Sequence, residues 1–76
     1  MNSYKTTNIY LAAAMLSLGA ELEDIDYSDR RHQVFILGGR QDFSMIEKQW
    51  YANQLNGNLC RYKDALQKLK SKIHSF

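Results

Sequence analysis

The chain has no proline and a single cysteine, Cys60, among its 76 residues. A lone cysteine excludes a disulfide within the chain and leaves no Cys-x-x-Cys pair for a metal, which favours a reducing compartment. The absence of proline argues against a linker, and a hydrophobic content of 45% excludes a disordered tail. The net charge of +2 is too small to indicate a nucleic-acid partner by itself. We expect one domain over residues 1–76, with an ordered core of about residues 6–74.

The chain also lacks an apolar run long enough to cross a membrane. Its longest run, IYLAAAMLSLGA from Ile9 to Ala20, ends after about a dozen residues, whereas a membrane-spanning helix needs about 20. The length suits the apolar part of a signal peptide, but Lys5 is the only base that precedes it. We therefore expect no membrane span and a protein that works in the cytoplasm.

This apolar run is instead typical of a core helix. The residues before it are polar, and Thr6 or Thr7 is the expected N-cap. Gly19 stands where a left-handed residue ends a helix. The sequence therefore predicts a helix over residues Asn8–Leu18.

Two segments rich in β-branched and aromatic residues follow. Leu22–Tyr27 and Gln33–Leu37 are expected strands, and the polar residues Ser28–Arg31 between them predict a β-hairpin. Leu22 and Ile25 fall on opposite sides of a regular strand. A bulge near Glu23-Asp24 places both on one face.

A second helix is expected after the glycines Gly38-Gly39. Asp42 or Ser44 is its N-cap, since Ser44 and Glu47 have the spacing of a capping box. The turn residues Asn56-Gly57-Asn58 end it. Its buried stripe consists of Phe43, Ile46 and Trp50.

A third helix is expected over about Arg61–Ile73. Its apolar stripe consists of Tyr62, Leu66, Leu69 and Ile73. The order α-β-β-α-α predicts an α+β fold, a small single domain in which three helices pack on a β-hairpin. A two-stranded hairpin is marginally stable, so we expect its edges to pair with a second chain.

Three segments of this sequence resemble a known family: TTNIYLAAAMLSLGAELEDIDY, RRHQVFIL and RYKDALQKLKSKIH. The family consists of short phage and prophage proteins and is known only as a domain of unknown function. The resemblance runs from Thr6 to His74, and it includes the apolar run, which argues against a cleaved signal peptide. It implies a phage-type accessory gene and this fold, and it supplies no catalytic residues.

One candidate site lies between the second strand and the second helix. The glycines Gly38 and Gly39 let backbone N–H groups approach an anion, and Arg40 can hold a phosphate. A flexible connection without a ligand is the alternative. We expect Arg30 or Arg31 at the hairpin tip to help bind this phosphate. Arg40 lies at the opposite end of the second strand from the hairpin tip, and the five extended residues between them span roughly 17 Å. An aromatic side chain, Tyr51 or Trp50, is expected to stack on the base of such a ligand.

A second candidate site is the basic last helix. Proteins hold nucleic acid with basic side chains and with aromatic residues nearby, and Tyr51 and Tyr62 are available as such aromatic residues. Bases near a helix C-terminus also complement the helix dipole without any ligand. The bases are Arg61, Lys63, Lys68, Lys70 and Lys72.

We expect no enzyme, no metal site and no cofactor. His32, His74 and Cys60 are too scattered for a metal, and the acidic run Glu21–Asp29 lacks the order of an EF-hand. The function expected is that of a phage-type accessory protein that antagonises a host process or defence by sequestering a phosphorylated, nucleotide-like ligand. Inhibition of a host protein by direct binding and nucleic-acid binding are the alternatives.

We also expect a homo-oligomer, most simply a dimer. The first helix is apolar almost all the way round, and one hairpin with two helices is not expected to cover every face of it. The adjacent residues Trp50 and Tyr51 point about 100° apart on a helix, so one narrow stripe does not bury both.

Overall fold

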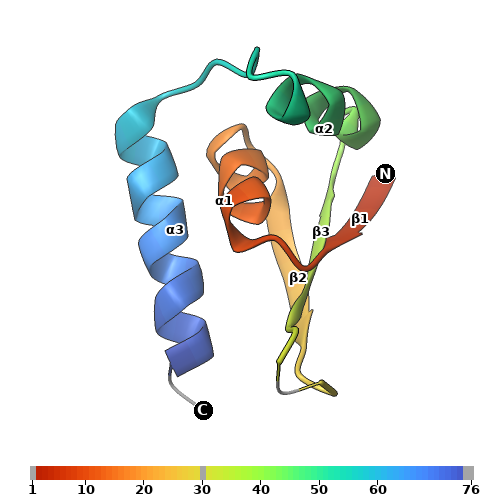
Figure 1. Cartoon of the computed structure of the whole chain (residues 1–76), viewed down its shortest axis with the longest axis vertical. Coiled ribbons are helices and arrows are strands. Elements are labelled where there is room, and N and C mark those ends of the chain that lie inside the picture. Colours follow the sequence, from red (N-terminus) through yellow and green to blue (C-terminus); the bar gives the residue numbers. More distant parts are fainter. Residues whose placement is uncertain (1, 30, 75–76) are drawn as a thin grey trace.

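The computed structural model of the chain describes residues 2–29 and 31–74. The order of its elements is β-α-β-β-α-α (Figure 1). This confirms the expected α+β class and adds a strand at the N-terminus. The elements are β1 (Asn2–Thr6), α1 (Ile9–Ser17), β2 (Glu21–Asp26), β3 (Val34–Gly39), α2 (Phe43–Tyr51) and α3 (Leu59–His74).

The three strands form one antiparallel sheet in the order β1-β3-β2. Strand β3 is central, so Leu37 is paired with Tyr4 of β1 on one side and with Leu22 of β2 on the other. One of the two hairpin edges that we expected to pair with a second chain is therefore filled by β1 of the same chain. Sequence patterning missed β1 because Tyr4 is its one apolar residue.

The expected bulge in β2 is confirmed. The register shifts between Leu22 and Asp24, which leaves Glu23 as the extra residue of the strand. Leu22 is paired with Leu37 and Ile25 with Phe35, and Leu37 and Phe35 belong to the same buried face of β3. The extra residue thus turns both apolar side chains of β2 towards the core.

Helix α1 lies between the sheet and α3 (Figure 1). Five consecutive residues of α1 are at most 4% exposed, and Leu69 of α3 is completely buried against the same core. Because α1 is covered from two sides within one chain, most of its apolar circumference is buried without a partner, and the expected homo-oligomer stays a prediction. The five residues are Leu11, Ala12, Ala13, Ala14 and Met15.

The start of α1 differs from the expectation. Asn8 is the N-cap, and its Oδ1 accepts the N–H groups of Tyr10 at 3.0 Å and Leu11 at 3.3 Å. Thr6 stands outside the helix, where its Oγ1 accepts the N–H of Asn8 at 3.1 Å. The expected cap at Thr6 or Thr7 was wrong because Asn8 is the residue whose side chain reaches the free N–H groups of the first turn.

Helices α2 and α3 are joined by residues 52–58. Asp42 caps α2 by accepting the N–H of Met45 at 3.1 Å, one of the two caps expected. Asn58 does the same for α3, since its Oδ1 accepts the N–H groups of Cys60 at 2.9 Å and Arg61 at 3.1 Å. Helix α2 ends at Tyr51, well before the Asn56-Gly57-Asn58 turn that was expected to end it.

No helix within residues 2–29 and 31–74 is long and apolar enough to cross a membrane.

Candidate functional site

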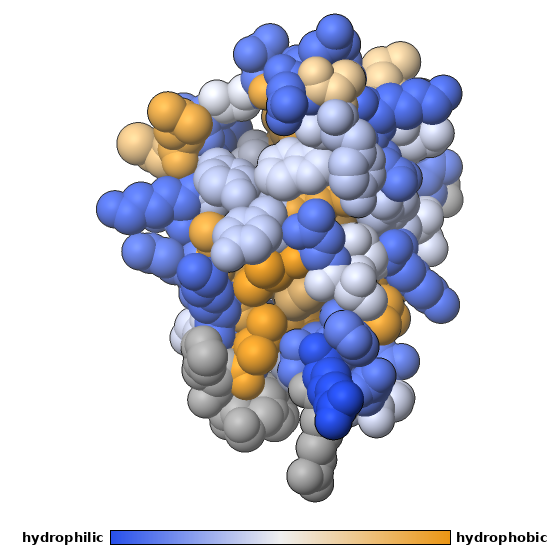
Figure 2. Space-filling view, in the orientation of Figure 1, coloured by the Kyte–Doolittle hydropathy of each residue, from blue (hydrophilic) through white to orange (hydrophobic). Residues whose placement is uncertain are grey.

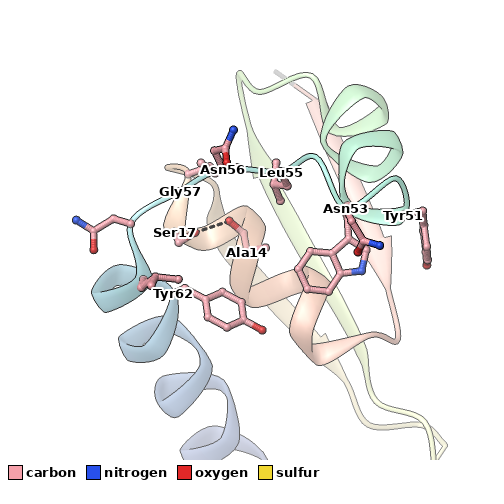
Figure 3. A pocket seen from close by; sticks show the side chains of 12 residues that line it. Ala14, Ser17, Tyr51, Asn53, Leu55, Asn56, Gly57 and Tyr62 are labelled. Carbon is pink, nitrogen blue, oxygen red and sulfur yellow. Dashed lines mark hydrogen bonds between the residues drawn. The ribbon is translucent and has the colours of Figure 1, made fainter.

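A groove of about 560 Å³ lies between the C-terminal end of α1, the connection of residues 52–58 and the start of α3 (Figure 3). We call it the aromatic groove. Its volume falls in the range of small-molecule sites, about 300–1,000 Å³. All of its lining residues are uncharged: Ala14, Ser17, Leu18, Trp50, Tyr51, Asn53, Leu55, Asn56, Gly57, Asn58, Leu59 and Tyr62.

Three aromatic residues line the groove, and they come from two helices. Trp50 and Tyr51 end α2, whereas Tyr62 belongs to the first turn of α3 and extends towards α1 (Figure 3). Trp50 and Tyr62 are half-buried, while Tyr51 is 65% exposed. Pale side chains, the colour of aromatic residues such as these, form a band on the surface of Figure 2 with apolar side chains visible beneath. The groove therefore offers flat apolar surfaces from two sides.

The side chain of Tyr62 is partly shielded from solvent. Burial raises the pKa of Tyr62, and the neighbouring Tyr10 of α1 raises it further. The Tyr62 hydroxyl therefore stays protonated at neutral pH and remains a hydrogen-bond donor at the groove.

The polar side chains of the groove divide into two kinds. Ser17 and Asn58 are engaged by the fold, since the Ser17 hydroxyl donates to the carbonyl of Ala14 at 2.7 Å and Asn58 caps α3. The side-chain amides of Asn53 and Asn56 make no hydrogen bond to the described part of the chain, and both residues are exposed. Each of these two amides can donate to and accept from a ligand.

The path of residues 52–58 forms one wall of the groove. Asn53 has a φ of 57°, a left-handed conformation that asparagine tolerates better than most residues, and it turns the chain away from α2. At the other end, a side-chain carbon on Gly57 would lie 3.7 Å from Leu18 at the end of α1. The connection thus packs against α1 and closes the groove on that side.

The glycines of the expected phosphate site lie inside β3. Gly38 is paired with Ser3 on one side and Glu21 on the other, and Gly39 is paired with Asn2. The carboxylate of Glu23 lies over Gly38, where a side-chain carbon would be 2.5 Å from its Oε1. A phosphate site at Gly38-Gly39 stays a prediction, but the strand pairing and a nearby negative charge both count against it.

The arginines expected beside these glycines are spread along the hairpin. Arg40 is exposed just after β3, and Arg31 is exposed before its other end, so the two are not brought together within one chain. Arg30 lies outside the described residues. Of the residues expected to bind a ligand, only the two aromatic candidates, Trp50 and Tyr51, line the aromatic groove.

The five bases of α3 are exposed and lie on both sides of its buried stripe. At about 100° per residue, one flank carries Arg61, Lys68 and Lys72, and the other carries Lys63 and Lys70. The apolar contact with α1 separates the flanks, so the five side chains do not form a single patch.

No group of three metal-binding side chains comes together within the described residues. Cys60 and His32 are both exposed and lie in different parts of the fold, at the start of α3 and before β3. The side chain of His74 lies outside the described residues.

The asparagines of the groove carried a weak signal in the sequence. Asn53, Asn56 and Asn58 cluster within six residues, which was interpreted only as the end of a helix. Their approach to Tyr62 depends on how α3 packs against α1, and local patterning does not reveal that packing. The sequence singled out the aromatic pair Trp50-Tyr51 but joined it to Gly38-Gly39 before the start of α2, whereas the two residues end α2 and line the aromatic groove.

These features define a small α+β domain with a helix between an antiparallel sheet and a C-terminal helix, and with an uncharged aromatic groove at one end. The chain belongs to the family described as a domain of unknown function (DUF5659), which matches residues 1–75. Neither a curated protein nor a solved structure matches the chain.

Proposed function

We propose that the protein binds a nucleotide-like ligand without transforming it, and that the aromatic groove holds the flat ring of that ligand. One observation carries the proposal. The groove combines aromatic faces from α2 and α3 with two free side-chain amides and contains no charged side chain. Flat heteroaromatic rings stack on such faces and form hydrogen bonds with amides along their edges.

Within the groove, each group has a separate role. Tyr62 and Trp50 offer the stacking surfaces, while the exposed ring of Tyr51 covers the ligand from the rim. Asn53 and Asn56 recognise donors and acceptors on the edge of the ring. No nucleophile with an adjacent base is needed for this role, so we propose binding without turnover.

The phosphate groups of such a ligand would lie outside the uncharged groove. Arg61 and Lys63 are exposed in the first two turns of α3, next to the lining residues Leu59 and Tyr62. Either cation is suited to a phosphate that extends over the start of the helix, where the helix dipole is also favourable. The resemblance to phage proteins makes sequestration of a host nucleotide or defence signal the proposed biological role.

The test uses the fluorescence of Trp50, the only tryptophan of the chain. Adenosine, guanosine, their monophosphates and cyclic dinucleotides are titrated into the protein, and at least one is expected to change the emission of Trp50 with saturation. Tyr51→Ser is expected to weaken binding by roughly tenfold, since stacking on one aromatic ring contributes about 1–3 kcal/mol per base.

Asn56→Ala serves as the second variant, and Gln54→Ala is its matched control, because Gln54 is exposed in the same connection but does not line the groove. Asn56→Ala is expected to weaken binding and Gln54→Ala to leave it unchanged. Wild-type affinity in both Tyr51→Ser and Asn56→Ala would place the site elsewhere. Conversion of the bound ligand to product would overturn binding without turnover.

A second candidate, nucleic-acid binding by α3, is favoured by the exposure of its five bases. Binding of this kind weakens steeply with salt because each phosphate contact releases a counterion. We expect an uncharged nucleoside in the groove to bind equally well at 50 and 200 mM salt. A steep salt dependence with single-stranded DNA or RNA, abolished by Lys68→Ala with Lys70→Ala, would assign the function to α3 instead.

A further inference from the structure

The sheet has two edges of very different character. Strand β3 is paired on both sides, whereas β1 and β2 each keep one side without a strand partner among the described residues. An unpaired edge exposes backbone N–H and C=O groups and readily takes up another strand. In Figure 1, β1 forms the margin of the sheet, with no element beyond it.

The β2 edge is protected against self-association. Its bulge at Glu23 breaks the regular register that a further strand would need. Four of its six residues are acids. Antiparallel pairing of β2 with a second copy of itself places Glu21 opposite Asp26 and Glu23 opposite Asp24 of the partner subunit. Like charges that face one another across strands are destabilising.

The β1 edge has no such protection. Its five residues are paired with β3 in an unbroken register, from Asn2 opposite Gly39 to Thr6 opposite Phe35. It contains one charge, Lys5, and neither proline nor a bulge. Lys5 is the one protective charge on this edge, and the regular register of β1 leaves its backbone groups able to pair with a further strand.

Strand β1 is also complementary to itself. The antiparallel register that pairs all five residues places Tyr4 opposite Tyr4 of the partner subunit. Lys5 then faces Ser3 of the partner subunit, and Asn2 faces Thr6 of the partner subunit. No like charges meet, and the central pair is aromatic, which is a favourable cross-strand combination.

Helix α2 adds an apolar contact beside this edge. Tyr4 stacks on Phe43, and Glu47 and Tyr51 of α2 lie close enough to Tyr4 to affect its hydroxyl. Tyr51 is 65% exposed, so the flank of α2 that follows the β1 edge presents a large uncovered ring. A second copy paired through β1 would bring its own α2 to this ring.

We propose that two copies of the chain associate through β1 and form a twofold-symmetric dimer with a continuous six-stranded sheet. Twofold pairing of a single edge closes the assembly at two subunits, because the acidic, bulged β2 strands are left at the outer edges. The interface is separate from the α1 surface on which a dimer was first expected. Tyr51 borders both this interface and the aromatic groove, so the test of the interface uses variants of β1 and leaves Tyr51 unchanged.

The test changes the charge opposite Lys5. Ser3 is exposed and its side chain makes no hydrogen bond to the described part of the chain. In Ser3→Lys, two pairs of lysines face each other across the dimer axis, and we expect the dimer dissociation constant to rise on the order of tenfold. Ser3→Glu places opposite charges there and is expected to tighten the dimer. Ser3→Lys with Lys5→Glu again places opposite charges across the axis and is expected to reverse the weakening and bind at least as tightly as the wild type.

The measurement is the mass in solution by sedimentation over a range of concentrations, with twice the chain mass of 8.9 kDa expected for the wild type. Ser71→Lys is the matched control, since Ser71 is exposed on α3 and its variant is expected to dimerise like the wild type. A mass of one chain at millimolar concentration would overturn the proposal. So would a mass that keeps rising beyond two chains, or a dimer unaffected by both Ser3→Lys and Ser3→Glu.

Discussion

The ring of Tyr4 in β1 stacks on the ring of Phe43 in α2, with centroids 5.6 Å apart and planes inclined by 28°. This contact joins the first strand of the chain to a helix that follows the last strand. Burial, the hydrogen bond to Glu47 and the negative charge of that carboxylate together raise the pKa of Tyr4 to about 12, and burial has the largest effect. The neutral form of Tyr4 is therefore the form that the fold stabilises.

This pKa predicts a loss of stability in alkali. The contribution of Tyr4 is fully present below its unfolded pKa of 10.0 and is lost as the pH rises towards its folded pKa of about 12. Tyr4→Phe keeps the stacked ring but has no proton to lose. We expect the wild type to lose stability relative to Tyr4→Phe between pH 10 and pH 12, measured by urea denaturation. Parallel stability curves for the two proteins over that range would contradict the prediction.

The adjacent glycines of β3 are expected to respond differently to alanine. Gly39 has a φ of 148°, and a side-chain carbon there would lie 2.2 Å from Oε1 of Gln41, whose Nε2 donates to the carbonyl of Leu18. Gly39→Ala is expected to lower the free energy of unfolding by about 1–3 kcal/mol. At Gly38 the obstacle is the exposed side chain of Glu23, which can turn aside, so Gly38→Ala is expected to lower the free energy of unfolding by less than Gly39→Ala does. Equal losses in the two variants, measured by urea denaturation, would show that this explanation is wrong.

The cap of α1 gives a third prediction. Asn8→Ala removes the oxygen that accepts two backbone N–H groups, and we expect a loss of about 1 kcal/mol in the free energy of unfolding. Thr7→Ala is the control, because Thr7 is exposed and precedes the cap. Thermal denaturation of both variants measures the difference. If Thr7→Ala lowered the free energy of unfolding more than Asn8→Ala, Thr7 would be the N-cap, as first expected.

The packing of α3 on α1 gives the fourth prediction. Leu69 is completely buried, so Leu69→Ala is expected to lower the free energy of unfolding by about 2–5 kcal/mol, a large share for a small domain. Lys70→Ala changes the neighbouring exposed residue and is expected to have an effect within about 0.5 kcal/mol. Chemical denaturation followed by circular dichroism distinguishes them. A small effect at Leu69 would mean that α3 contributes little to the core.

Much of this fold follows from local patterns. The apolar run predicts α1, the opposite parity of Leu22 and Ile25 predicts the bulge of β2, and the stripe from Tyr62 to Ile73 predicts α3. Strand β1 does not follow, because four of its five residues are polar and its conformation comes from pairing with β3 far along the chain. The strand conformation of β1 is set by backbone hydrogen bonds to β3, and such bonds leave no pattern in the sequence.

The candidate site was less predictable than the fold. Glycines before a helix suggested an anion site, but whether such glycines are free depends on the neighbouring strand, and β1 takes up the second side of Gly38. The groove depends on residues from α1, α2 and α3 that meet only in the folded chain. Tyr51 was identified because an aromatic ring can stack on a base, whereas Asn53 and Asn56 acquire their role from the path of the connection.

The position of α1 between the sheet and α3 has a consequence for synthesis. Ribosomes add residues at about 5–20 per second and release the N-terminal part first, so the apolar turns of α1 emerge before either of the layers that cover them. Strand β3 must follow before β1 can pair, and α3, which packs against α1, is made after β3. The nascent chain therefore carries its most apolar segment uncovered while β3 and then α3 are still being added, and chaperone contact is expected at residues 9–17 during that interval.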